Sequence, residues 1–360
     1  MHKLAIRPTL INHNESYPLP PHAKLSSRLV HSGLVAVTVI AVAACSSNPA
    51  DAPPPTISPA AAAVSPPVDA APDGQLRPLA APALSSTFDP ASRNLVVLSG
   101  PPGATSTVTA FPANGQPRSA ALPAPATAMT GDGAGTVYLA TRGGYFRFDV
   151  ARGATERIDV QGQEARDFTA IARRGDGRIV LGSADGSVYT LASDNTVSAE
   201  LDVFARVDAL VAQGDTVIVL DRSQTSVTSV DASGTKAAHA LRAGDGATTI
   251  AADSAGRVLV VDTRGEQLLV FGSDPLMLRQ RYPVRGAPYG LAGSPGLAWV
   301  SETATNSVVG YDLATGIPVE KVRHRTVQQP NSLAYDDKTD TLYVVSGSGA
   351  GVQVIKGATR

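Results

Sequence analysis

Short apolar runs recur about every 40 residues through residues 75–360, and this period constrains the fold more than any other feature of the sequence. Seven copies of a four-strand repeat can be superimposed. In each copy an inner strand is followed by a turn, an apolar second strand, a third strand and a more polar fourth strand. The equivalent positions on the seven inner strands are Ser86, Met129, Ile171, Leu210, Ile250, Leu291 and Leu333. Four strands per copy without helical periodicity predict an all-β fold, a seven-bladed β-propeller over residues 75–360.

The seventh copy is one strand short, because it ends after its third strand near Lys356. Residues 75–79, just before the first copy, can supply the missing outer strand. We therefore predict an N-terminal strand that closes the last blade and leaves no open sheet edge.

The single cysteine, Cys45, directly follows a 12-residue apolar run, 33–44, and precedes polar, proline-rich chain. The run is too short to cross a bilayer, and basic residues lie ahead of it, which is typical of a signal peptide. Small residues before the cysteine resemble a lipobox. We expect residues 1–44 to be a lipoprotein signal peptide and Cys45 to be acylated, which anchors an exported protein to the outer leaflet of the bacterial cytoplasmic membrane. The alternative is a buried structural cysteine.

Residues 45–74 form the next segment, and residues 46–82 contain ten prolines and few large apolar side chains. Such chain cannot close a core by itself. We expect an extended tether whose 29 residues after Cys45 reach about 90 Å and hold the propeller away from the membrane.

Several stretches of the propeller region resemble the LppL family of mycobacterial lipoproteins. They are residues 167–174, 241–244, 315–323 and 328–333. The repeats also resemble, more loosely, NHL and YVTN-type propellers, which are mostly binding scaffolds. These resemblances imply the propeller fold and an envelope location, and they imply no reaction.

Charge and histidine content exclude some functions. The first 44 residues hold four of the 30 basic and one of the 31 acidic side chains, which leaves 26 basic and 30 acidic residues in the remainder. Nothing in this balance favours nucleic-acid binding. Removal of the leader leaves only His239 and His324, both in expected outer strands. We assign no catalytic residue.

One face of the ring is the expected site of binding, since the loops that lead into the inner strands and those that join the second and third strands open on it. These loops carry arginines with acids interspersed, and one glutamate, Glu302. Arginine forks suit a carboxylate or phosphate ligand. The predicted ligand-binding residues are Asp167, Arg206, Asp208, Arg242, Tyr289, Gln329 and Asn331. The alternative is that neighbouring Arg and Asp side chains pair with each other and lock the ring.

A metal-dependent lactonase is the enzyme alternative, because residues 330–336 resemble the segment that supplies an asparagine metal ligand in gluconolactonase-type propellers. That reading makes Asn331 and Asp208 ligands of a divalent cation such as Ca²⁺. The first copy lacks the glutamate that those enzymes need. We therefore expect no cofactor and favour a binding or scaffolding propeller that takes a small anionic ligand or an envelope protein partner. A structural component of an envelope complex is a further alternative.

Overall fold

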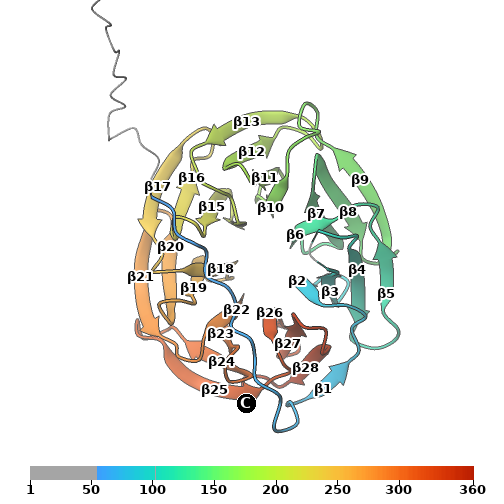
Figure 1. Ribbon diagram of the computed structural model, residues 1–360, viewed down its shortest axis with the longest axis vertical. Helices are drawn as coiled ribbons and strands as arrows, with labels where there is room; N and C mark the ends of the chain where they lie inside the picture. The colour runs from blue at the N-terminus through green and yellow to red at the C-terminus, as the bar shows by residue number, and fades with distance from the viewer. Residues whose placement is uncertain (1–54, 102) are drawn as a thin grey trace, which may run out of the picture. The chain divides into compact units, whose positions relative to one another are not determined.

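The computed structural model describes residues 55–360 except residue 102, so Cys45 and the expected signal peptide lie outside the described residues. Seven antiparallel sheets of four strands each are arranged in a ring, which confirms the predicted seven-bladed β-propeller (Figure 1). In the part of the chain described here, no helix is long and apolar enough to cross a membrane.

Each of the first six blades runs in chain order from its inner to its outer strand. Blades 1 to 3 consist of β2 (Ala83–Asp89), β3 (Asn94–Ser99), β4 (Thr107–Pro112) and β5 (Arg118–Ala121); β6 (Ala126–Gly131), β7 (Thr136–Thr141), β8 (Gly144–Asp149) and β9 (Ala154–Asp159); and β10 (Phe168–Arg173), β11 (Ile179–Ser183), β12 (Ser187–Leu191) and β13 (Val197–Asp202). Blades 4 to 6 consist of β14 (Ala209–Gln213), β15 (Thr216–Asp221), β16 (Ser226–Val230) and β17 (Ala237–Arg242); β18 (Ala247–Ala252), β19 (Arg257–Asp262), β20 (Gln267–Ser273) and β21 (Leu276–Pro283); and β22 (Pro288–Gly293), β23 (Leu297–Glu302), β24 (Ser307–Asp312) and β25 (Val319–Arg325).

Blade 7 contains β26 (Pro330–Asp336), β27 (Thr341–Ser346) and β28 (Val352–Lys356), and its outer strand is β1 (Gln75–Arg77). The strands β1 and β28 are antiparallel, with Leu76 opposite Gln353. Arg77 then reaches blade 1, where Nη1 donates to the Pro112 carbonyl (2.6 Å) and the guanidinium lies 5.2 Å from the centre of the Phe111 ring. The N-terminal strand therefore closes the ring as predicted.

The apolar core lies between blades, because the second and third strands present side chains to both neighbours. Every residue of β3, β11, β23 and β27 is buried, whereas β5, β9 and β17 on the outside are mostly exposed. Trp299, the largest buried side chain, packs in the cluster between blades 6 and 7 with Leu333 and Val344. Burial on both faces explains why the second strands of the blades read as continuous apolar runs rather than alternating patterns.

Residues 57–73, which we call the strap, cross the loops of blades 4 to 7 on one face of the ring (Figure 1). The strap starts where Ile57 N donates to Ser223 O (2.8 Å) and ends where Asp73 N donates to Arg325 O (3.1 Å). This part of the segment was expected to be a free tether, and that expectation is wrong for residues 57–73. The strap has few large apolar side chains, but the propeller loops bind its backbone, which composition does not reveal.

Candidate functional site

The strap divides the loop face into a covered half, over blades 4 to 7, and an open half. The open half holds a cavity of about 570 Å³ between blades 2 and 3. Its lining combines three arginines and two acids with small and apolar groups: Ala124, Pro125, Thr127, Thr141, Arg142, Arg157, Glu164, Asp167, Phe168, Thr169, Ala184 and Arg206. We call it the open pocket. Thr127 also lines the central channel, a cavity of about 610 Å³, so the two spaces adjoin.

The arginines of the open pocket are held in place but retain free donor capacity. Arg142 Nη1 lies 3.5 Å from Asp167 Oδ1, and both side chains are more than half exposed. Arg157 Nε bonds Asp159 (2.7 Å), and its Nη2 donates to the Arg142 carbonyl (3.0 Å). Arg206 Nε bonds Asp208 (3.1 Å). A guanidinium has five N–H donors, so each arginine can add a ligand oxygen without losing its present partner.

Beside the open pocket, Arg166 pairs with Asp185, whose other oxygen accepts from Ser183 Oγ (2.5 Å). The Ser183 hydroxyl, followed by the Arg166 guanidinium, lowers the pKa of Asp185 below its usual range. Arg166 does not line the open pocket and is therefore not part of the anion-binding set.

Two of the predicted site residues, Gln329 and Asn331, lie beside the strap's contact with blade 7: Gln329 binds the strap, and Asn331 is bonded to Gln329. Gln329 Nε2 donates to Ala63 O (2.7 Å) and to Asn331 Oδ1 (3.2 Å), and its Oε1 accepts from Ser65 N (3.1 Å). The Asn331 side chain also packs closely against Gly347. Both residues lie on the loop face as expected, but the chain itself occupies their polar groups.

The other predicted residues are dispersed. Asp167 and Arg206 meet in the open pocket. Asp208 lines the central channel, where it accepts from Arg206 Nε and Arg222 N. Arg242, at the end of β17, lies 3.8 Å from Asp245 on the outer side of the ring, and Tyr289 contributes its carbonyl to Thr249 Oγ1 (2.5 Å). The structure therefore does not gather these residues into one site.

The cation alternative finds no support in the arrangement of side chains. Among the described residues, no group of three or more His, Cys, Asp or Glu side chains converges. Asn331 is bonded to Gln329, and Asp208 is bonded to Arg206 and Arg222. A hard cation needs several converging oxygens, which this pair of residues does not supply.

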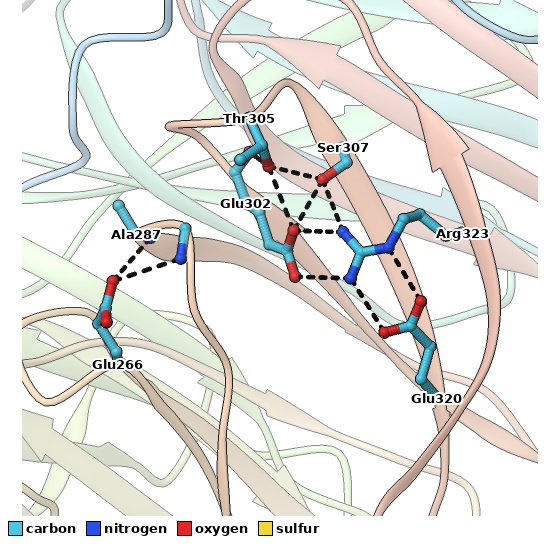
Figure 2. Close-up of polar contacts among 8 residues, drawn as sticks. Glu266, Ala287, Glu302, Thr305, Ser307, Glu320 and Arg323 are labelled. Carbon is cyan, nitrogen blue, oxygen red and sulfur yellow. Dashed lines mark hydrogen bonds and ion pairs between the residues drawn. The ribbon is translucent and has the colours of Figure 1, made fainter.

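Glu302 is not a channel residue, contrary to the sequence-based expectation. It is buried at the end of β23 and faces the outer strand, where Arg323 Nη1 and Nη2 bond its two oxygens at 2.5 and 3.3 Å (Figure 2). Arg323 also bonds Glu320, and the hydrogen bonds to Glu320 and Glu302 raise the pKa of Arg323. Figure 2 also shows Glu266, which accepts from the amides of Gly286 and Ala287. These glutamates hold loops and strands together.

Both histidines of the described region lie on outer strands. His239 is exposed on β17. His324 on β25 bonds the Ala358 carbonyl (2.8 Å) and stacks on Trp299. Neither reaches the open pocket or the channel lining.

Sequence reasoning missed Arg157, because it lies on the polar outer strand β9, whose pattern indicates only solvent exposure. It also did not predict that Ser65 is buried on the loop face, since a serine in proline-rich chain carries no signal of burial.

Comparisons with known proteins support the fold. No protein-family model and no curated protein matches this chain. Among solved structures, streptogramin B lyase is similar with a TM-score of 0.65 and 10% identity over 79% of this chain and 97% of the lyase. A catalytically inactive histidine-to-alanine variant of virginiamycin B lyase from Staphylococcus aureus, with quinupristin, gives a TM-score of 0.63 and 11% identity over 78% and 97% of the two chains. Hydrazine synthase of Kuenenia stuttgartiensis gives 0.61 and 14% over 80% and 99%.

At these identities the likeness shows the seven-bladed propeller fold alone. None of the comparisons bears on the resemblance to LppL-type lipoproteins or to NHL and YVTN repeats.

Proposed function

We propose that this chain is an exported cell-envelope lipoprotein, anchored through Cys45, whose propeller binds a small anionic ligand that also has an apolar part. The observation that carries the ligand proposal is the open pocket. Arg142, Arg157 and Arg206 surround it, and Pro125 and Ala184 give it an apolar surface. A carboxylate or phosphate can accept from the guanidinium groups while the rest of the ligand covers the apolar surface.

The open pocket replaces the wider site expected from the sequence, because the strap already occupies Gln329, and Asn331 is bonded to Gln329. The weak pair between Arg142 and Asp167 is the point of ligand entry. At 3.5 Å and with both groups exposed, this pair contributes little to stability, so a ligand anion can displace Asp167 at low cost.

Binding without catalysis is favoured over the lyase chemistry of the structural neighbours. Loss of one histidine leaves virginiamycin B lyase catalytically inactive. Here both histidines of the propeller lie on outer strands, away from the pocket and the channel. Thus no residue of this chain is proposed as a catalyst.

The ligand proposal is tested with 1-anilinonaphthalene-8-sulfonate, a fluorescent anion with an apolar ring system, titrated into the mature chain carrying Cys45→Ser. We expect saturable binding that Arg142→Ala weakens about tenfold, the loss expected for one charge-assisted hydrogen bond. Arg152→Ala is the control, because Arg152 is also exposed and paired with an aspartate but lies outside the open pocket. Equal affinities for the two variants would exclude the open pocket.

The anchor is tested separately on the full-length chain in a bacterial host. Metabolic labelling with an alkyne-bearing palmitate analogue should mark the unaltered protein and not the Cys45→Ala variant. Retention of the label in that variant would exclude acylation at Cys45.

A further inference from the structure

The covered half of the loop face binds the strap mainly through the strap's backbone carbonyls. Five side chains from blades 4 to 7 donate to them. They are Arg222 to Ala60, Arg264 to Ser58 (2.7 Å), Gln329 to Ala63 (2.7 Å), Gln328 to Ser65 and Pro66 (both 3.2 Å), and Asn306 to Pro66 (2.9 Å). Every residue type has a carbonyl, so this row of donors recognises an extended chain largely without regard to its sequence.

Two positions add selectivity for small side chains. Ala60 is 8% exposed and lies over Gly246, where a Cβ on the glycine would be 3.0 Å from the Ala60 Cβ. Ser65 is 4% exposed; its hydroxyl donates to Thr303 O (2.7 Å) and accepts from Gln329 N (2.9 Å). Prolines flank both positions in the sequence, at 59 and 66. The surface therefore fits an extended, proline-containing chain with a small residue and, five residues later, a serine.

Some of the donors are also held by contacts that do not involve the strap. Arg264 Nη1 bonds Asp245 O (3.1 Å), and Gln329 Nε2 bonds Asn331 Oδ1 (3.2 Å). Arg222 is fixed at its amide, which donates to Asp208 (2.8 Å). The side chains of Arg264 and Gln329 are thus held without the strap, which lowers the ordering cost of binding a peptide.

The strap buries little apolar surface against the propeller. Ile57, Val64 and Val68 are 36, 89 and 40% exposed, and the strap forms no strand. A segment with so little buried apolar surface opens at a smaller free energy than the blades beneath it.

We propose that the surface under residues 57–66 is a binding site for extended Ala/Pro-rich peptide segments with a serine before a proline, and that the strap fills it in cis. When the strap detaches, the site takes a segment of the same chemistry from a partner protein. This mode of binding resembles the general recognition of polyproline-type chains, in which a pre-extended peptide loses little entropy. The proposal is independent of the open pocket and of acylation at Cys45.

The test uses the mature chain with Cys45→Ser and a fluorescein-labelled synthetic peptide of residues 55–69, followed by fluorescence anisotropy. The double substitution Ala60→Arg/Ser65→Arg ejects the strap, because neither buried position has room for arginine. We expect saturable peptide binding to this double variant. The unaltered chain should bind the peptide at least tenfold more weakly, because its own strap competes at high effective concentration. Adding Gln329→Ala to the double variant should also weaken peptide binding at least tenfold. A peptide that itself carries Ser65→Arg should not bind. Absence of binding to the folded variant, or equal binding to the unaltered chain, overturns the proposal.

A second measurement needs no substitution and covers the case in which the double variant does not fold. Hydrogen exchange of the unaltered chain should show the amides of Ile57 and Ser65 exchanging at least a hundredfold faster than those of the buried strand β19. Equal protection of the two sets would mean that the strap opens only with the whole propeller, and this result also overturns the proposal.

Discussion

Gln329 and Ser65 are joined by two hydrogen bonds that run in opposite directions across 264 positions of sequence: Gln329 N donates to Ser65 Oγ (2.9 Å), and Ser65 N donates to Gln329 Oε1 (3.1 Å). Gln329 has a φ of 55°, which costs a non-glycine residue about 1 kcal/mol or more. The pair offsets that cost and fixes the strap to blade 7.

Ser65→Ala should therefore destabilise the chain, because it leaves the half-buried Gln329 amide and the Thr303 carbonyl without their partner. We expect the free energy of unfolding in urea to fall by about 1–3 kcal/mol. Ser58→Ala is the control, since Ser58 is exposed on the same strap. Equal effects of the two substitutions would contradict a specific role for Ser65.

The repeats and the ring closure could be predicted because they leave a periodic apolar signal. The strand Val258-Leu259-Val260-Val261, for example, is buried on both sides by neighbouring blades, so its residues must be apolar. The closing strand β1 was predictable from counting, since a ring with 27 strands in its repeats lacks one.

The strap and the details of the site could not be predicted, because they depend on groups without a sequence signal. Ala63 and Pro66 contribute only carbonyls, which every residue has. The loop arginines were visible in the sequence, but their partners were not. Arg142 pairs with Asp167 from the next blade, whereas Arg206 pairs with its near neighbour Asp208, and only the fold distinguishes these cases.

Substitution of Glu302 tests whether this glutamate stabilises the fold rather than binding a ligand. Its carboxylate is buried and bonded to Arg323, Thr305 and Ser307 (Figure 2). Glu302→Gln should lower the free energy of unfolding by about 2 kcal/mol, because Arg323 loses a buried charged partner. Glu320→Gln removes an exposed partner of the same arginine and should cost less than about 1 kcal/mol. We expect neither variant to alter binding at the open pocket, and a ranking of the two in the reverse order would contradict this account.

Asp73 makes the end of the strap sensitive to acid. Burial alone would raise the pKa of Asp73, but hydrogen bonds from the Arg325 amide and guanidinium, with the charges of Arg325 and His324, outweigh it and lower the pKa below 3.8. A carboxylate with a lowered pKa stabilises the folded state above its unfolded pKa, and this stabilisation disappears as the pH falls through the folded pKa.

Comparison of thermal unfolding between pH 6 and pH 2 checks this linkage. The unaltered chain should lose stability below about pH 4 more steeply than Asp73→Asn, which lacks the titrating group. Asp69→Asn, at an exposed position of the strap, should follow the unaltered chain. Parallel curves for all three proteins would show that the Asp73 contact contributes nothing to stability.

The closing strand β1 should determine whether the propeller stays monomeric. Chains that begin at residue 75 or at residue 80 both lack the strap, and only the first retains β1, which covers β28. Without β1, the backbone of β28 is an exposed sheet edge that can pair with a second molecule, and Arg77 no longer bridges to Pro112. We expect the chain from residue 75 to elute as a monomer in size-exclusion chromatography with light scattering, and the chain from residue 80 to form dimers or larger aggregates. If both chains are monomers of equal stability, ring closure by β1 is dispensable, and the interfaces between blades alone hold the first blade to the seventh.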